Sequence, residues 1–255
     1  MIVLQPGNRK EKQLMNKYDD IAQYYDLLME SGYYDYQKAA QSIDSILKGR
    51  KKLLEIGVGT GLLAEKLLEL DSSYEITGID FSTAMLDRSK ARLGNRAKVV
   101  EGNVLSMDLQ EDFDGVYSQG GPINFNRVGN DYHLNMLPNF EDSVKMLNNI
   151  ARHLVDGGLL VLNIQGEKTE VDGDRDIGNG IVYAQQKHLC FLENQEMYFW
   201  EKDYIFKKEG EIVARDRHKF LMIYGQLLED TMKAAGFKLK QATPDDLYMV
   251  YQKAI

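Results

Sequence analysis

The stretch "KKLLEIGVGTGLLAEKLLE", Lys51 to Glu69, carries glycines at three alternate positions, Gly57, Gly59 and Gly61. An apolar run at 53–56 precedes the glycines, and an Ala/Leu/Lys/Glu-rich segment follows them. This order predicts a strand that continues through a turn into a helix. Glycine is required where a turn needs positive φ or where the backbone must approach a ligand closely. The stretch therefore predicts the first ligand-binding turn of an α/β sheet.

The same alternation of apolar strands and amphipathic helices continues along the chain. Strands that are apolar throughout indicate a parallel sheet covered by helices on both faces. We expect a Rossmann-like, doubly wound, seven-stranded and mostly parallel sheet. Its strands are predicted at 53–56, 75–79, 98–101, 114–118, 159–164, 237–242 and 247–252, and its helices at 62–70, 83–93, 139–155 and 225–235, with Gly157 and Gly158 ending the third helix.

A different pattern interrupts this core between 166 and 224. Residues 166–180 read as a loop, and three long alternating strands follow at 181–192, 197–207 and 212–224, which predicts a three-stranded antiparallel insertion. Ahead of the core, residues 1–13 read as a loose leader and Met15–Leu47 as helical. The expected division is an N-terminal helical lid at 1–50, a core at 51–165 and 225–255, and an insertion at 166–224 that contacts substrate or a second subunit.

Composition narrows the class of protein. The 255 residues are 44% hydrophobic and 27% charged, which is typical of a globular protein. The net charge of -8 without a basic run disfavours nucleic acid as a partner. No apolar run has the length of a membrane span, the N-terminus lacks a signal-peptide pattern, and Cys190 is the only cysteine. We therefore expect a cytoplasmic protein without membrane contact or disulfides.

Two carboxylates beside the glycines indicate the cofactor. Asp80 ends the second predicted strand, where a carboxylate accepts hydrogen bonds from ribose hydroxyls. The glycine spacing is G-x-G-x-G, whereas dinucleotide folds usually carry G-x-G-x-x-G. Glu55, two residues before the first glycine, would repel a pyrophosphate but favours a sulfonium or an α-amino group. This combination points to S-adenosylmethionine.

Five segments together carry a family resemblance: "LLEIGVGTG", "ITGIDFSTAML", "VVEGNVLSMDL", "FDGVYSQGGPINF" and "LVDGGLLVLNI". The chain from about Leu53 onward resembles the class I S-adenosylmethionine-dependent methyltransferases. The tyrosine-rich N-terminal segment and the insertion after the fifth strand are similar to the small-molecule branch, which includes glycine N-methyltransferase and the sugar-amine N-methyltransferases.

The resemblance implies roles for individual residues. Gly57, Gly59 and Gly61 would shape the turn under the methionine moiety, with Gly61 letting the next helix begin close to the strand. Glu55 would orient that turn or the amino group, and Asp80 would hold the ribose. The other implied cofactor contacts are Phe81 and Met85 near the adenine, Asn103 and Val104 at the adenine edge, Ser118 and Gln119 facing the sulfonium, and Tyr18 and Tyr25 as a lid.

The predicted reaction is transfer of a methyl group to an N or O atom of a small molecule, with S-adenosylhomocysteine as product. Such a reaction depends on alignment and water exclusion, so no catalytic triad is expected. Candidate catalytic residues are His133, in the loop after the fourth strand, His218 and Tyr33, each with side-chain packing as the alternative. A non-catalytic cofactor-binding module and a nicotinamide oxidoreductase are the alternative functions.

Aromatic residues alternate along the second strand of the insertion, at Tyr198, Trp200, Tyr204 and Phe206. A sheet face packed on the core or on a second subunit is the favoured interpretation, and a homodimer is the corresponding expectation. A cage for a substituted ammonium is the alternative. The acidic residues between Glu167 and Asp176 lack the bidentate Glu of a calcium loop, so we expect no metal.

Overall fold

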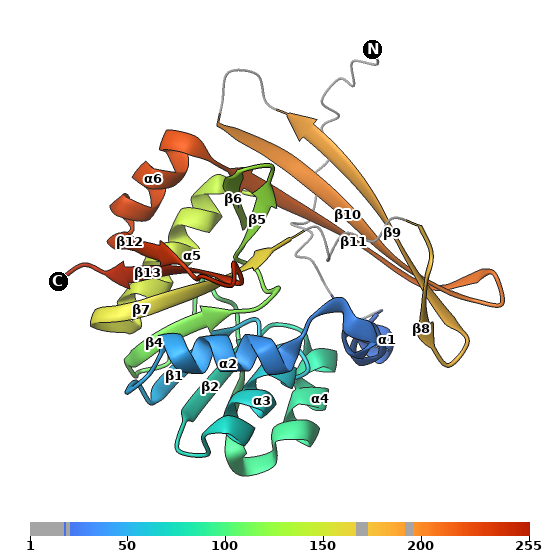
Figure 1. Cartoon of the computed structure of the whole chain (residues 1–255), viewed down its shortest axis with the longest axis horizontal. Coiled ribbons are helices and arrows are strands. Elements are labelled where there is room, and N and C mark those ends of the chain that lie inside the picture. The colour runs from blue at the N-terminus through green and yellow to red at the C-terminus, as the bar shows by residue number, and fades with distance from the viewer. Residues whose placement is uncertain (1–17, 19–20, 167–172, 192–195) are drawn as a thin grey trace.

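The computed structural model describes residues 18, 21–166, 173–191 and 196–255. Its described strands form one network of thirteen, flanked by helices (Figure 1). The predicted leader at 1–13 and most of the acidic cluster, at 167–172, lie outside the described residues. Within the described ranges, no helix has the length and apolarity needed to span a bilayer.

The core of the network follows the strand order β3–β2–β1–β4–β7–β13–β12. The first five of these strands are parallel, and β13 runs antiparallel to both of its neighbours. The central, largely parallel sheet expected from the sequence is therefore confirmed. The strand bounds are β1 Lys52–Ile56, β2 Glu75–Asp80, β3 Lys98–Glu101, β4 Phe113–Ser118, β7 Leu154–Gln165, β12 Phe237–Ala242 and β13 Tyr248–Lys253.

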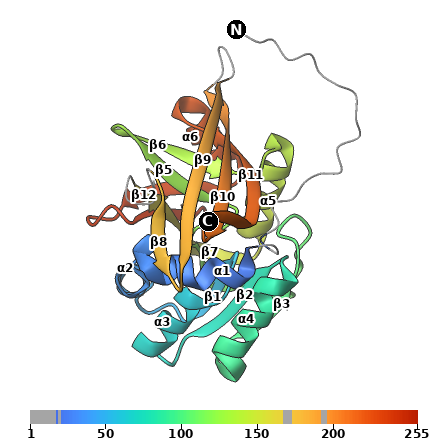
Figure 2. The ribbon, with the colours of Figure 1, turned by 90° about the vertical axis from the view of Figure 1, so that its right-hand side faces the viewer.

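Helices cover both faces of this core, as Figures 1 and 2 show. Side chains alternate across a strand, so Leu53 of β1 packs into one apolar cluster while Leu54 and Ile56 pack into the other. The first cluster contains α2, α3 and the end of α4, and the second contains α5 and α6. These helices span α2 Tyr36–Ile46, α3 Leu62–Leu70, α4 Thr83–Leu93, α5 Phe140–Arg152 and α6 Gly225–Ala234.

Polar side chains fix where several of these helices begin. Ser82 accepts a hydrogen bond from the Met85 N–H at the start of α4. Asn139 accepts one from the Asp142 N–H at the start of α5, and Asp35 does the same for α2. Each cap satisfies an N–H that lacks a partner within the helix.

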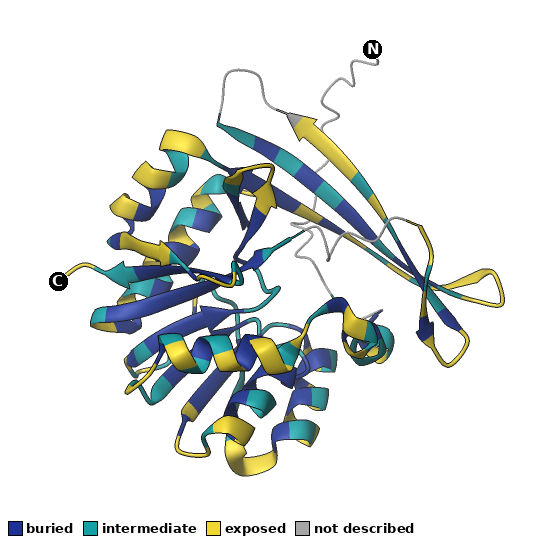
Figure 3. Cartoon of the chain, in the orientation of Figure 1, coloured by how far each residue is buried: buried dark blue, intermediate teal, exposed yellow. Residues whose placement is uncertain are grey.

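A second set of strands extends the sheet in the order β7–β5–β6–β11–β10–β9–β8. The last residues of β7 leave the core and pair with β5, which places Phe125 beside Ile164. We call β9, β10 and β11 the meander. Figure 3 shows exposed residues along the second half of β9 and at the start of β11, on the two sides of β10. The bounds are β5 Asn124–Val128, β6 Asp131–Met136, β8 Arg175–Gly178, β9 Ile181–Phe191, β10 Met197–Lys208 and β11 Glu211–Ile223.

The N-terminal helices connect the meander to the core. Helix α1 (Ala22–Leu28) continues into a π-helical turn, η1 (Met29–Tyr33). Leu28 and Tyr33 share an apolar cluster with Tyr183 of β9 and Phe206 of β10, and Leu62 of α3 belongs to the same cluster. Helix α1 and η1 are therefore packed between the meander and the glycine-rich side of the core.

Three expectations about secondary structure are wrong. The helix over Met15–Leu47 is broken, because Gly32 has a φ of +90° and Asp35 starts a new helix. The seven predicted core strands and the three of the insertion are present, but two segments predicted as loop are strands: residues 124–136 form a hairpin that joins core and meander, and Arg175–Gly178, within the predicted loop at 166–180, forms β8, which gives thirteen described strands. The hairpin has few apolar residues and a Gly-Asn turn, which reads as loop.

The third error concerns the fifth predicted strand. Gly157 and Gly158 lie within β7 and do not end α5, which stops at Arg152. The pairing of β4 with β7 shifts register between Phe113 and Gly115. A Cβ on Gly158 would lie 2.8 Å from the Val155 carbonyl oxygen, so glycine permits the close backbone approach at this irregularity.

Candidate active site

The glycine turn after β1 packs against the loop that follows β4. Gly57 has a φ of +74° and donates its N–H to the Ile79 carbonyl at 2.9 Å. A Cβ on Gly57 would lie 2.9 Å from Pro122 Cδ and 3.0 Å from Gly121 Cα. These distances leave no room for a side chain, so glycine is required for the two loops to meet.

The other two glycines have different neighbours. A Cβ on Gly59 would meet nothing within 4 Å, so the chain is open toward a ligand at this position. A Cβ on Gly61 would lie 2.8 Å from Ser89 Oγ and 3.0 Å from Leu93 Cδ1, both on α4. Gly61 therefore permits close packing of α3 against α4, and its expected role in the approach of the helix to the strand stays a prediction.

Asp80 at the end of β2 holds the glycine turn. Its Oδ2 accepts a hydrogen bond from the Gly59 N–H at 2.9 Å, and its Oδ1 accepts one from the Ser82 N–H at 3.0 Å. A carboxylate oxygen has two lone pairs and can accept more than one hydrogen bond. Asp80 is therefore placed to shape the turn and to accept bonds from a diol at the same time.

Glu55 is a buried acid beside this turn, with 2% of its surface exposed. Burial raises the pKa of its carboxyl to about 8, and the charge of Asp80 adds to that effect. The hydroxyl of Tyr117 donates to Glu55 Oε2 at 3.1 Å and acts in the opposite direction. An acid of this kind becomes charged readily once a cation binds next to it.

Glu55, Gly57 and Gly59 line a hollow that we call the glycine-loop pocket, whereas Gly61 and Asp80 are not part of its lining. The buried Thr60 Oγ1 in its wall has no hydrogen-bond partner among the described residues. Burial raises the pKa values of Tyr25 and Tyr36 well above normal, so both phenols are neutral. The lining residues are Tyr25, Tyr36, Glu55, Gly57, Val58, Gly59, Thr60, Leu62, Leu63 and Gln119.

The structure brings Tyr25 and Gln119 of the other expected cofactor contacts into this pocket, whereas Phe81, Met85, Asn103, Val104 and Ser118 are not among its lining residues and Tyr18 lines a different pocket. Asn103 Oδ1 accepts the Leu105 N–H at 2.9 Å, and the Val104 carbonyl accepts from Asn149. Met85 is buried in the first turn of α4, and Phe81, which precedes that helix, is half-buried. The buried Ser118 donates its hydroxyl to the Ile56 carbonyl at 3.0 Å, which ties β4 to β1.

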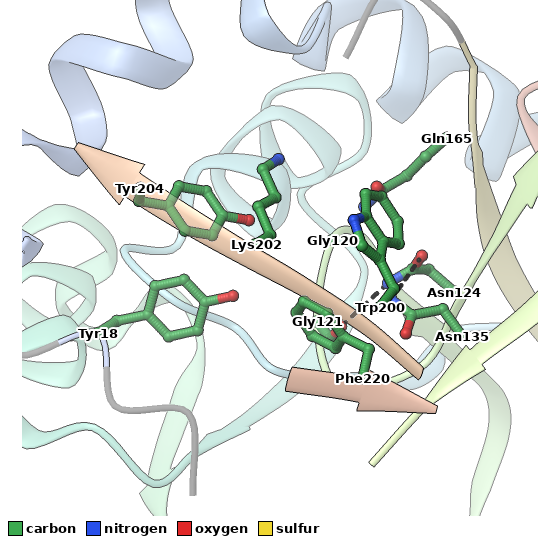
Figure 4. Close-up of a pocket in the computed structure, with 10 residues that line it drawn as sticks. All are labelled: Tyr18, Gly120, Gly121, Asn124, Asn135, Gln165, Trp200, Lys202, Tyr204 and Phe220. Carbon is green, nitrogen blue, oxygen red and sulfur yellow. Dashed lines mark hydrogen bonds between the residues drawn. The ribbon is translucent and has the colours of Figure 1, made fainter. Parts of the chain in front are cut away.

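A second hollow lies between the core and the meander. Figure 4 shows this meander pocket, with Tyr18, Lys202 and Tyr204 on one side and Trp200 with two asparagines on the other. Its lining is Tyr18, Gly120, Gly121, Asn124, Asn135, Gln165, Trp200, Lys202, Tyr204 and Phe220. None of these residues carries a carboxylate or an imidazole.

The aromatic stripe of β10 is divided between several environments. Trp200 and Tyr204 line the meander pocket, whereas Tyr198 bonds to His133 and Phe206 packs on the N-terminal helices. Burial raises the pKa of Tyr204 to about 12. Sequence reasoning found the aromatic residues of this strand but missed the lysine between them.

The three candidate catalytic residues lie outside both pockets. His133 is in strand β6, not in a loop, and its Nδ1 lies 2.9 Å from the Tyr198 hydroxyl. Burial lowers the pKa of His133. His218 is fully buried against the ring of Tyr18, with centroids 4.2 Å apart. The Tyr33 hydroxyl accepts a hydrogen bond from Lys202 Nζ.

The two pockets meet at the end of β4. Gln119 lines the glycine-loop pocket, and the next residue, Gly120, lines the meander pocket. The Tyr248 hydroxyl donates to Gln119 Oε1 at 2.6 Å, and the Gly120 N–H donates to Asn163 Oδ1 at 2.8 Å. Both residues are thus held in place, and ligands in the two pockets would approach each other across this loop.

Several lining residues of the meander pocket were missed by sequence reasoning: Asn124, Asn135, Gln165, Lys202 and Phe220. They come from strands β5, β6, β7, β10 and β11. No local pattern marks Asn124, Asn135 or Lys202, because β5 and β6 carry few apolar residues and Lys202 lies between Glu201 and Asp203. Only the pairing of the strands brings these side chains to one site.

Several known proteins that this chain resembles are methyltransferases. Residues 53–158 match the family model described as a methyltransferase domain. An uncharacterized methyltransferase of Bacillus licheniformis is 34% identical over 90 residues, which are 35% of this chain and 40% of that protein. For three such bacterial relatives, the match spans 40 to 47% of their length.

Solved structures show the same fold over almost the whole chain. DesVI of Streptomyces venezuelae has a TM-score of 0.63 at 21% identity and covers 92% of this chain and 99% of its own. CalS10, an amino pentose methyltransferase from Micromonospora echinaspora solved with bound S-adenosylmethionine, has a TM-score of 0.61 at 16% identity and covers 90% and 96%. The comparisons therefore show a methyltransferase-domain match over residues 53–158 and the fold of these structures over almost the whole chain.

Proposed function

We propose that this protein is a methyltransferase that binds S-adenosylmethionine in the glycine-loop pocket and methylates a small molecule held in the meander pocket. The observation that carries the proposal is the contact of the two pockets at Gln119 and Gly120. A cofactor and an acceptor bound on the two sides of this loop meet where the transfer must occur. A binding module without turnover would need only the first pocket.

The glycine-loop pocket and the carboxylate that holds its turn fit this cofactor. Asp80 bonds to the Gly59 N–H at the end of β2, where a carboxylate would accept hydrogen bonds from ribose hydroxyls, and Glu55 is placed to attract a cationic group. Thr60 Oγ1 is buried without a hydrogen-bond partner among the described residues, so this hydroxyl can form a hydrogen bond with a bound ligand. In the same proposal, the adenine lies against Phe81, Met85, Asn103 and Val104. Tyr18 and Tyr25 close over the bound cofactor.

When bound, S-adenosylmethionine supplies an electrophilic methyl group: the acceptor's lone pair bonds to the methyl carbon as the carbon–sulfur bond breaks, sulfur keeps the electron pair, and the acceptor releases its proton. The protein aligns the two reactants and excludes water. Helix α1 and the meander enclose the site from the side opposite the core. The phenols of Tyr18 and Tyr204 are neutral because burial raises their pKa values, so neither acts as a base at neutral pH.

An amine suits this pocket better than a hydroxyl as the acceptor group. A neutral amine attacks without prior loss of a proton, whereas a hydroxyl needs a general base. The lining of the meander pocket offers no carboxylate or imidazole for that task. The sugar and amino pentose substrates named for structures of the same fold are in agreement with a nitrogen acceptor.

Calorimetric titration with S-adenosylmethionine tests the first half of this proposal, with NADH as the control ligand. We expect micromolar affinity for the former and no binding of the latter. Asp80→Asn should weaken binding about tenfold or more, through one lost charge-assisted bond. Asp87→Asn, an exposed position on α4, is the matched control. Binding of NADH alone would contradict the proposal.

Turnover is a separate measurement. Release of S-adenosylhomocysteine over a panel of small amines would support methyl transfer. Cofactor binding without release over that panel would favour the non-catalytic module. A homodimer formed through the insertion stays a prediction, which sedimentation would test.

A further inference from the structure

Lys202 is a buried cation in the wall of the meander pocket, with 3% of its surface exposed. Its Nζ donates a hydrogen bond to the Tyr33 hydroxyl at 2.7 Å and lies 4.5 Å from the centre of the Tyr204 ring. No carboxylate among the described residues forms an ion pair with it. Buried lysines are rare and are normally paired with an opposite charge.

Besides Lys202, two buried side chains in this pocket each have a polar atom without a hydrogen-bond partner among the described residues. One is the Trp200 indole N–H, two residues from Lys202 on β10, and the other is Asn135 Oδ1 on β6. Both residues are more than nine-tenths buried. An unsatisfied buried donor or acceptor destabilises the fold, so a ligand that satisfies these atoms gains affinity. The pocket thus presents a cation, a donor and an acceptor.

We propose that the methyl acceptor is a small amine that also carries an anionic group. The anionic oxygens bind the Lys202 ammonium and the Trp200 N–H, and the amine donates a hydrogen bond to Asn135 Oδ1. This inference rests on the proposed function and names the class of its substrate. A carboxylate and a phosphate both meet the requirement, and the experiment separates them.

The charge of Lys202 also determines the state of the bound amine. A nearby positive charge disfavours the protonated ammonium and favours the neutral amine, which is the nucleophilic form. For the same reason the aromatic stripe is a poor cage for a substituted ammonium. The face of Tyr204 is already occupied by the Lys202 ammonium, which would repel a second cation.

The only tryptophan of the chain lines this pocket, so its fluorescence reports occupancy directly. The wild-type protein, saturated with S-adenosylhomocysteine, is titrated with three amines of matched length: β-alanine, O-phosphoethanolamine and the uncharged β-alaninamide. We expect at least one anionic amine to bind with a Kd about tenfold or more below that of β-alaninamide. Which of the two anions binds more tightly distinguishes a carboxylate from a phosphate.

Lys202→Met then tests the residue itself, because it keeps the length of the side chain and removes the charge. It should abolish the preference for the anionic amine, while Lys208→Met, an exposed lysine on the same strand, should keep it. Equal affinities for all three amines in the wild type would overturn the proposal without any variant. So would an unchanged preference in Lys202→Met.

The failure of this inference and the failure of the proposed function give different results. If S-adenosylmethionine binds and neutral amines are methylated as fast as anionic ones, the function stands and the anionic class is wrong. If the anionic amines bind selectively but no methyl transfer occurs, the anion site stands and the function is wrong.

Discussion

The glycine-loop pocket and the meander pocket are neighbours, but they are built in different ways. Most of the first comes from one stretch of chain, residues 55–63, between β1 and α3. The second combines side chains of β5, β6, β7, β10 and β11 with Tyr18. A site built from one stretch can be recognised by its spacing, whereas a site built from many strands depends on their pairing. The cofactor could therefore be predicted from the sequence, whereas the pocket for the acceptor could not.

The largest effect should come from the crowded glycine of the first pocket. Gly57→Ala would place a methyl group 2.9 Å from Pro122 Cδ and 3.0 Å from the Gly121 backbone. We expect affinity for S-adenosylmethionine to fall about a hundredfold, which is near the 3 kcal/mol that local strain costs. Titration calorimetry measures this loss.

Gly210→Ala is the control for Gly57→Ala. Gly210 also has a positive φ, of +85°, but it has open space around it at the tip of the meander. The control should lower the melting temperature slightly and leave cofactor affinity unchanged. Equal losses of affinity in both variants would mean that the contact between the two loops does not matter.

The next effect concerns the charge of Glu55. Its pKa of about 8 means that the carboxyl is mostly protonated at neutral pH without a ligand. A bound cation favours the carboxylate, so affinity for S-adenosylmethionine should rise by about tenfold between about pH 6 and pH 9. Glu55→Gln should flatten this rise, and Glu69→Gln, at an exposed position on α3, should not.

Glu55 also makes an opposite prediction for stability without ligand. A raised pKa in the folded state contributes stability below the ordinary value of 4.5, and that contribution is lost as pH rises through about 8. Thermal unfolding should therefore show a melting temperature that decreases over this range, and Glu55→Gln should decrease less. A wild-type curve that is flat up to pH 9 would contradict the assigned pKa.

A smaller effect should separate the meander from the cofactor site. The buried Asp203 accepts hydrogen bonds from Arg217 and Arg215, at 2.6 and 2.5 Å, and these lower its pKa to about 2. Asp203→Asn should cost about 1.5–3 kcal/mol of unfolding free energy, as hydrogen bonds to charged groups do. Chemical denaturation measures the loss.

The effect of Asp203 also depends on pH. Because its pKa is lowered, its stabilisation is present above about pH 4 and is lost as pH falls toward 2. Cofactor affinity should not change in Asp203→Asn. Glu201→Gln is the control on the same strand, because its partner Lys219 is 3.7 Å away and half exposed. A loss of cofactor affinity in Asp203→Asn would show that the two pockets are coupled.

The smallest effect is expected at His133. Its ring stacks on Tyr224 with centroids 4.6 Å apart, and it lies outside the meander pocket. His133→Phe keeps the stacking, so kcat for the best amine should stay within about twofold of the wild type. A loss of about a hundredfold would instead identify His133 as the general base.

The local pattern predicted the elements around the cofactor well. Helices α3 and α4 begin and end at the predicted residues, because amphipathic spacing and an N-cap act over a few neighbouring positions. The three strands of the meander also agree within a few residues, since alternation is a local signal. Errors arose where a long-range contact decided the structure, as in the β5–β6 hairpin.

The sequence alone therefore determined the α/β core, the glycine turn and the acid that faces it, because each depends on residues that are close along the chain. Tertiary structure decided the rest. It placed Lys202, Trp200 and Asn135 around one pocket, and it buried Glu55 deeply enough to raise its pKa. Burial and strand pairing are properties of the folded molecule. Only in that molecule does a charge or a hydrogen-bonding group without a partner become part of a binding site.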